Sequence, residues 1–189
     1  WKQDYIIDRA PWGYPINLKF LKEIKSNIKI IILVRDIIEV LGSFINWSNR
    51  EPTAFVNRYE AKTVEEKCDM LMNKDGQIVK ELIGIKHLLD HQPKEIYHVV
   101  KFNDLVKNTE NTIDGVYNFL GISKFKHDFN NISQFKVNDM GYDDTIVGNG
   151  LHTLKTGAIS NYKEKYDAYS IIPKSIIDKY KQCNFWEEI

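Results

Sequence analysis

Apolar residues recur along the chain with two spacings, one typical of strands and one typical of helices. Residues 28–34, "IKIIILV", form a mostly β-branched run that predicts a strand buried on both faces, as in parallel sheets. Residues 95–102, "EIYHVVKF", predict a second strand. Residues 4–8, "DYIID", predict a short strand near the start, which ends at the Pro- and Gly-containing loop "RAPWGYP".

Segments with helical spacing lie between and after these runs. "INLKFLKEIKS" follows the first loop, and "DIIEVLGSFINW" begins with Asp36 as the expected N-cap of a helix. "GQIVKELIGIKHLLDH" is the clearest amphipathic helix, "NTENTIDGVYNFLGI" is a helix stopped by Gly121, and "PKSIIDKYKQ" is a final short one. The alternation of strands and helices predicts an α/β fold with a mainly parallel sheet. The sequence shows no internal repeat or domain boundary, so we expect residues 1–189 to form a single domain.

The composition excludes several classes of protein. The 26 basic and 26 acidic residues cancel, so no overall field draws the chain onto nucleic acid, and an anion site must be local. No apolar run reaches the roughly 20 residues that span a bilayer. We expect a cytoplasmic protein whose two cysteines, Cys68 and Cys183, are reduced thiols. Because the chain begins at Trp1 rather than Met, we expect its N-terminus to be incomplete and any targeting signal or anchor to lie upstream.

An arginine and a serine after the central apolar run suggest an anion site. Ligands of open α/β sheets bind at the carboxyl ends of the strands, where Arg35 is expected. Ser43 follows eight residues later, about 80° around the next helix. Gly42 costs a helix interior about 1 kcal/mol relative to alanine, which a close approach to its backbone would explain. Arginine and serine together suit phosphate. In the alternative interpretation, Arg35 pairs with Asp36 or Glu39 and the serine bonds within its own helix.

A resemblance to a known family favours the phosphate interpretation. "KIIILVRDIIEVLGSFINW" resembles the 3′-phosphate-binding segment of PAPS-dependent sulfotransferases, where a strand ends in Arg and a Ser follows at the same interval. The resemblance implies that Arg35 and Ser43 hold the 3′-phosphate. It also implies a three-layer α/β/α domain with a P-loop NTPase-like sheet, 3′-phosphoadenylyl sulfate (PAPS) as co-substrate and no required metal.

Two further segments resemble the same family. "IYHVVKFNDLVKNTENTIDGVYNFLGI" is similar to a strand-loop-helix that carries a "YEDL" turn, so Phe102 is expected near the nucleotide, although it lacks the tyrosine hydroxyl. "YIIDRAP" resembles the strand-end "K-x-P" of many members, and Arg9 replaces a lysine that would stabilise the transferring sulfonate as charge builds on the bridging oxygen. The alternative makes Arg9 an ion-pair partner of Asp8 or Asp4.

"LKTGAISNYK" is similar to the loop that closes over the nucleotide, usually R-K-G-x-x-G-x-W-K. Lys155, Thr156 and Gly157 fall on the R-K-G, and Tyr162 falls on the aromatic position. The sequence departs from the pattern at Lys155, Thr156, Ser160 and Tyr162. The resemblance implies that backbone and basic groups here fold over an anion, whereas "LKTG" alone is an ordinary solvated turn.

The resemblance implies transfer of a sulfonate from PAPS to a hydroxyl or amine, with release of adenosine 3′,5′-bisphosphate (PAP). It further implies that the acceptor is a small molecule, carbohydrate or peptide, and that the loops at residues 49–65 and 125–154 choose it. The family's Gly/Ser/Thr-rich loop for the 5′-phosphosulfate is not in this sequence, so we expect it upstream of Trp1. The alternatives are a non-catalytic nucleotide-binding homologue and a P-loop nucleotide kinase. The catalytic base and the oligomeric state stay open; His152, close to the closing loop, is the histidine of most interest.

Overall fold

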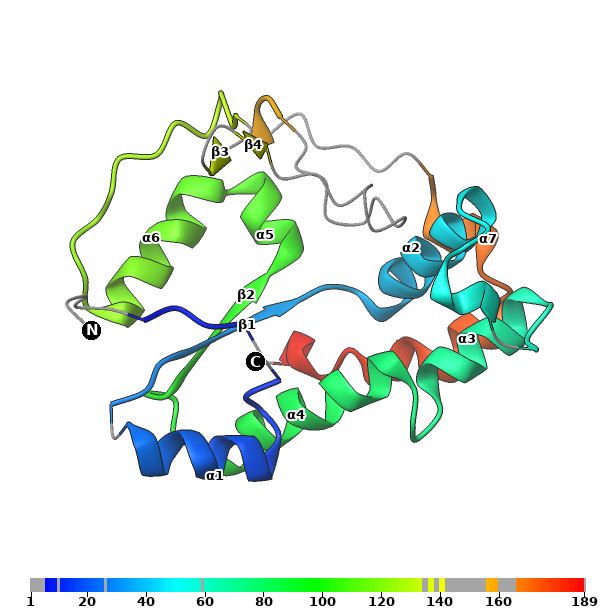
Figure 1. Ribbon diagram of the computed structural model, residues 1–189, viewed down its shortest axis with the longest axis horizontal. Helices are drawn as coiled ribbons and strands as arrows, with labels where there is room; N and C mark the ends of the chain where they lie inside the picture. Colours follow the sequence, from blue (N-terminus) through cyan, green and yellow to red (C-terminus); the bar gives the residue numbers. More distant parts are fainter. Residues whose placement is uncertain are drawn as a thin grey trace.

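A parallel pair of strands lies at the centre of the molecule (Figure 1). The computed structural model describes residues 6–9, 11–25, 27–58, 60–133, 136–137, 140–141, 156–159 and 166–188. Strand β1 (Ile30–Val34) pairs in parallel with β2 (Tyr97–Lys101), in a register that runs from Ile30 opposite Tyr97 to Val34 opposite Lys101. These are the two main strands that the sequence predicted, and they confirm an α/β fold with a parallel sheet.

Helices lie on both sides of the strand pair. In Figure 1, α5 and α6 lie on one side of the strands and α1 and α4 on the other. The described helices and turns are α1 (Pro15–Ile24), α2 (Ile37–Arg50), η1 (Phe55–Arg58), α3 (Val64–Met72), α4 (Gln77–His91), α5 (Phe102–Lys107), α6 (Thr109–Leu120), α7 (Ala168–Ile171), α8 (Lys174–Tyr180), η4 (Lys181–Cys183) and η5 (Phe185–Glu188). A two-residue antiparallel pair, β3 (Lys136–Val137) and β4 (Met140–Gly141), follows α6. No described helix is long and apolar enough to cross a membrane.

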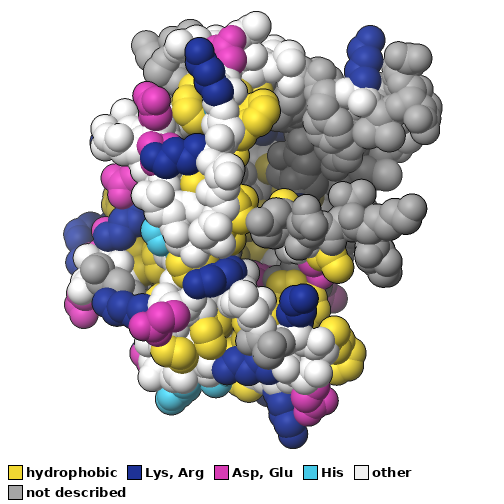
Figure 2. Space-filling model, turned by 90° about the vertical axis from the view of Figure 1, so that its left-hand side faces the viewer, with side chains coloured by type: hydrophobic (Ala, Val, Ile, Leu, Met, Phe, Trp, Pro, Cys, Tyr) yellow, Lys and Arg dark blue, Asp and Glu magenta, His cyan; other side chains and the backbone are white. Residues whose placement is uncertain are grey.

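Two sequence predictions about strands need correction. Residues 6–9 form no strand, and the rest of the strand predicted over residues 4–8 lies outside the described residues. Strand β1 is buried on one face only, because Ile32 and Val34 are 6% and 3% exposed whereas Ile31 and Leu33 are 44% and 58% exposed. On the second face α6 covers β2, where the ring of Phe119 stacks on His98. Apolar side chains thus remain at the surface, and the face drawn in Figure 2 shows such patches between charged groups.

Helix α2 begins and packs as its sequence predicts. The Asp36 carboxylate caps it by accepting the backbone N–H groups of Ile38 and Glu39. The buried face of α2 includes Ile37, Ile38, Leu41 and Ile45, which join the main hydrophobic core.

The close approach invoked to explain Gly42 is present, and it comes from the chain itself. A Cβ on Gly42 would lie 2.6 Å from the Cβ of Ala168, so α7 crosses α2 where the side chain is missing. In Figure 1, α2 and α7 accordingly lie side by side.

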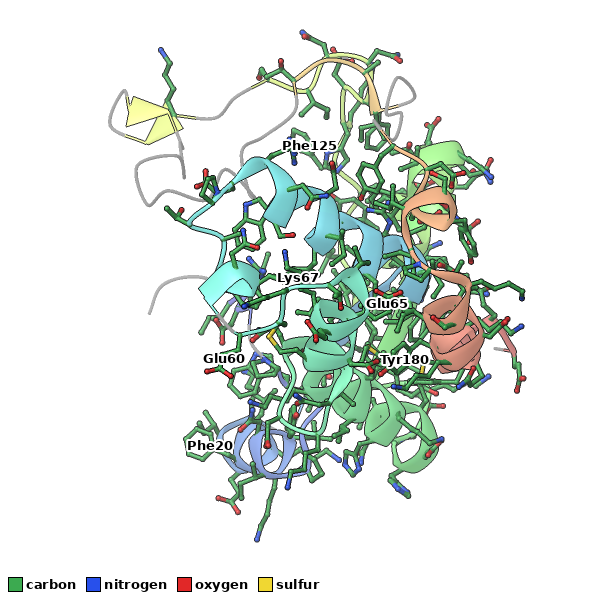
Figure 3. All side chains as sticks on the ribbon, turned by 90° about the vertical axis from the view of Figure 1, so that its right-hand side faces the viewer. Phe20, Glu60, Glu65, Lys67, Phe125 and Tyr180 are labelled. Atoms are coloured by element: carbon green, nitrogen blue, oxygen red, sulfur yellow. The ribbon has the colours of Figure 1, made fainter. Side chains whose placement is uncertain are left out.

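The end of the described chain returns to the same core. Ile172, Ile176 and Trp186 are 3%, 3% and 2% exposed, and all three belong to the core cluster. Tyr180, labelled in Figure 3, donates a hydrogen bond of 2.7 Å to Asp69 and so joins α8 to α3. Both cysteines are free thiols, as the sequence predicted.

Candidate functional site

The carboxyl ends of β1 and β2 bring Arg35 and Phe102 together. Arg35 follows the last residue of β1, Phe102 follows the last residue of β2, and the last residues of the two strands are paired. The guanidinium carbon of Arg35 lies 4.6 Å from the centroid of the Phe102 ring. This distance is well within the limit of about 6 Å for attraction between a cation and a ring face. Two of the residues expected at the nucleotide site therefore touch, although 67 positions separate them in the sequence.

Glu39 holds the same guanidinium from a second side. Arg35 Nε lies 2.9 Å from Glu39 Oε2, and the two side chains are only 18% and 27% exposed. Glu39 stands in the first turn of α2, where the helix dipole favours a negative charge. This is the ion pair that the alternative interpretation of the sequence predicted, and it coexists with the contact to Phe102.

A cavity of about 190 Å³ opens beside this ion pair. It lies between the start of α2 and the segment that leads into α7. Its lining consists of Arg35, Glu39, Tyr166, Asp167, Ala168 and Tyr169. A water molecule takes up about 30 Å³ in the liquid, so this space is large enough for a phosphate group with some hydration.

One carboxylate, that of Asp36, fixes the wall of the cavity. Its Oδ2 accepts a hydrogen bond of 3.1 Å from the Tyr169 hydroxyl and one of 2.7 Å from the Asn184 amide, while its Oδ1 caps α2. Asn184 Oδ1 in turn accepts the backbone N–H of Ile37 at 2.8 Å. Burial raises the pKa of Tyr169 to about 12, and the charge of Asp36 and the hydrogen bond to it act in the same direction.

Sequence reasoning found Asp36 as a helix cap but missed Tyr169 and Asn184. Both lie more than 130 positions downstream of Asp36 and belong to no recognised motif. The one available signal was indirect, because Gly42 implied that some other segment crosses α2.

Ser43 and Arg9 lie outside the lining of this cavity. Ser43 is half-buried on α2, one helical turn beyond Glu39. Arg9 is exposed, and its backbone N–H donates to the side chain of Asp8 at 2.8 Å. Among the described residues no ion pair joins the Arg9 guanidinium to an acid, and Asp4 is not one of them.

The segment similar to the nucleotide-closing loop is described only in part. Gly157 has φ 104°, a left-handed conformation that favours glycine, and it exchanges two backbone hydrogen bonds of 2.8 and 2.9 Å with Ile132. Thr156 beside it is exposed, and Lys155 and Tyr162 lie outside the described residues.

The described histidines do not line the cavity. The Nε2 of His127 lies 2.9 Å from the Tyr117 hydroxyl, His98 packs on Phe119, and the rings of His87 and His91 lie 5.0 Å apart on α4. The described residues contain no group of three or more His, Cys, Asp or Glu that could hold a metal ion. His152 lies outside the described residues.

The sulfotransferase domain model matches residues 16–150, which is more than two thirds of the chain. The chain belongs to the sulfotransferase domain family. Its function is therefore of the sulfotransferase type, and the resemblance noted in the sequence is confirmed at family level. The part of this sulfotransferase that matches contains Arg35 and Phe102 but ends before Tyr166. None of the curated proteins matches the chain significantly.

Proposed function

We propose that this sulfotransferase binds PAPS and transfers its sulfonate to a hydroxyl or amine of a small-molecule acceptor, releasing PAP. The observation that carries the proposal is the contact between Arg35 and Phe102 at the carboxyl ends of β1 and β2, beside a cavity. Ligands of parallel sheets bind at this edge. The family indicates the class of reaction, and this contact supports the proposal that the nucleotide binds at this edge.

Arg35 is the proposed ligand of the 3′-phosphate. Its guanidinium is planar and carries donors in a fixed fork, which suits a phosphate group. The Phe102 ring packs against the guanidinium and restricts its orientation, so less conformational entropy is lost when an anion binds. Ser43, one turn further along α2 from Glu39, is the proposed second donor.

Two further parts of the chain complete the proposed site. Lys155, Thr156, Gly157 and Tyr162 are proposed to close over the nucleotide, with backbone and basic groups around the anion. The positive φ of Gly157 favours glycine at this position. Arg9 is proposed to stabilise the bridging oxygen while the acceptor oxygen or nitrogen attacks sulfur and the bond from sulfur to that bridging oxygen breaks. Its side chain is exposed.

The test is calorimetric titration of the protein with PAP and with AMP, which lacks the 3′-phosphate. The wild type should bind PAP at least about tenfold more tightly, roughly 1.4 kcal/mol, and Arg35→Ala should remove that preference. Arg50→Ala is the matched control, because Arg50 is the last residue of α2, the helix that begins two residues after Arg35, and the substitution should leave both affinities unchanged. Equal binding of PAP and AMP, with no effect of Arg35→Ala, contradicts the proposal.

The proposed role of Arg9 is tested by kinetics. Arg9→Ala should slow release of PAP from PAPS in the presence of acceptor while leaving PAP affinity unchanged, because the proposed role is confined to the transition state. If this variant turns over at the wild-type rate, a residue other than Arg9 stabilises the charge on the bridging oxygen in the transition state.

A further inference from the structure

Glu39 stands between the two side chains that are proposed to hold the 3′-phosphate. Arg35, Glu39 and Ser43 follow one another at intervals of four residues. Glu39 and Ser43 share one face of α2, where side chains four apart have Cβ atoms roughly 5–6 Å from each other. Arg35 reaches the same face through its bond of 2.9 Å to Glu39. A phosphate held by both Arg35 and Ser43 must therefore lie against the Glu39 carboxylate.

Two other acidic side chains, one beside the cavity and one in its lining, differ from Glu39 in what they bind. Asp36 accepts two backbone N–H groups at the start of α2 and the side chains of Tyr169 and Asn184. Asp167 accepts the backbone N–H of Tyr169 at 3.0 Å and so caps α7. Both carboxylates stabilise the fold. Of the three, Glu39 is the one whose described bond goes to the arginine that an incoming anion needs.

We propose that Glu39 is a specificity-determining residue: it is the internal counter-ion of Arg35, and the 3′-phosphate of the nucleotide competes with it for that guanidinium. This inference rests on the proposed function and concerns the same site. In the free protein Glu39 neutralises Arg35. When the nucleotide binds, the phosphate takes over donors of the guanidinium and the Glu39 carboxylate, already 27% exposed, turns toward solvent. The competition lowers the affinity of the Arg35 guanidinium for any anion that binds there, so only an anion with further contacts in the site is held.

Glu39→Gln tests the competition, because glutamine keeps the length of the side chain and an oxygen that accepts from Arg35 Nε but removes the charge. We expect this variant to bind PAP about tenfold more tightly than the wild type and to bind AMP with unchanged affinity. Glu110→Gln is the matched control, since Glu110 also lies in the first turn of a helix, α6, and the substitution changes the net charge equally. Neither affinity should change in this control.

Glu39→Ala separates competition from positioning of Arg35. If Glu39 competes with phosphate, the alanine variant also binds PAP at least as tightly as the wild type. If Glu39 mainly positions Arg35, the alanine variant loses PAP affinity and Glu39→Gln leaves it unchanged, which overturns the proposal. Thermal unfolding of each variant establishes that it is folded.

The outcomes distinguish this inference from the proposed function. A wild type that prefers PAP over AMP, together with a Glu39→Gln variant that gains nothing, leaves the proposed function standing and overturns the role of Glu39. If the wild type binds PAP and AMP equally but the Glu39→Gln variant prefers PAP, the competition is supported. Glu39 then masks the site in the wild type. If neither protein prefers PAP, both proposals fail.

Discussion

Asp36 serves two structural purposes with its two carboxylate oxygens. Oδ1 caps α2, a local role that its sequence position predicted, and Oδ2 binds Tyr169 and Asn184 from the end of the chain. One side chain thus connects the start of α2 to the segment that forms the opposite wall of the cavity. The orientation of that wall depends on a charge adjacent to Arg35 in the sequence.

Asp36→Ala should lower the free energy of unfolding by about 2 kcal/mol, because it removes a cap worth about 1 kcal/mol and leaves polar partners unpaired. Asp36→Asn should cost about 1 kcal/mol, since asparagine still caps the helix but its amide nitrogen cannot accept from Tyr169 or Asn184. Urea denaturation measures both. Asp75→Ala, at an exposed turn position, is the control. Equal losses in the two Asp36 variants would mean that the contacts to the end of the chain contribute nothing.

Tyr169 gives the protein a pH dependence in alkaline solution. Its pKa is about 12 in the folded protein, against about 10 in an unfolded chain. The folded state therefore holds this proton more tightly, so the stabilisation is complete below about pH 10 and is lost as the pH rises through about 12. We expect Tyr169→Phe to remove one late step from the titration of tyrosinate absorbance. Tyr14 and Tyr180, whose pKa values burial also raises, remain as internal references. Loss of a step near pH 10 rather than near pH 12 would contradict the assignment.

At the scale of elements, the crossing of α2 and α7 lies beside the cavity. Gly42 permits the close approach on the α2 side, and Ala168 is the α7 residue that meets it. Ala168 also lines the cavity, so the contact that packs the two helices is continuous with the candidate site. Glycine destabilises a helix interior relative to alanine, and the close packing of α7 explains why α2 nevertheless contains Gly42.

Gly42→Ala should destabilise the protein although alanine is the better helix former. The added methyl group would lie 2.6 Å from the Ala168 Cβ, which cannot rotate away. Overpacking of this kind costs about 1–3 kcal/mol, more than the gain of about 1 kcal/mol from propensity. The double variant Gly42→Ala/Ala168→Gly should recover part of the loss, and a double-mutant cycle of unfolding free energies measures the coupling. Additive effects would show that the two residues do not meet.

At the scale of the whole molecule, the last described residues are part of the core. Ile172, Ile176 and Trp186 lie in the same hydrophobic cluster as the apolar face of α2. The segment 166–188 also supplies Tyr169 and Asn184 to Asp36. The match to the sulfotransferase domain family ends at residue 150. Residues beyond this boundary therefore supply part of the hydrophobic core and one wall of the cavity.

A chain cut at the family boundary, residues 1–150, should therefore not fold. We expect it to show no cooperative transition in urea and no binding of PAP.

Single substitutions at Trp186 test the same core more mildly. Trp186→Ala should lower the free energy of unfolding by about 3–5 kcal/mol, as large-to-small changes at buried aromatic residues do. Trp186→Phe should lower the free energy of unfolding by less, because the Trp186 Nε1 that is lost has no hydrogen-bond partner among the described residues. A cooperative unfolding transition in the shortened chain would contradict this view of the core.

The sequence by itself determined the elements whose signals are local. The apolar runs predicted β1 and β2, Asp36 predicted the start of α2, and Gly121 predicted the end of α6, where it has φ 69°. These features depend on interactions within a few residues of the chain, so the local pattern suffices to specify them. The family resemblance predicted that Arg35 and Phe102 both lie near the nucleotide.

Only the tertiary structure decided how those elements meet. The apolar run of β1 could not reveal that Ile31 and Leu33 stay exposed, because burial depends on which helices cover each face. The pairing of β1 with β2 brought Arg35 onto Phe102, and the return of the chain end brought Tyr169 and Asn184 to Asp36. Contacts across such separations arise from packing of whole elements against a shared core, and no short stretch of sequence contains both partners.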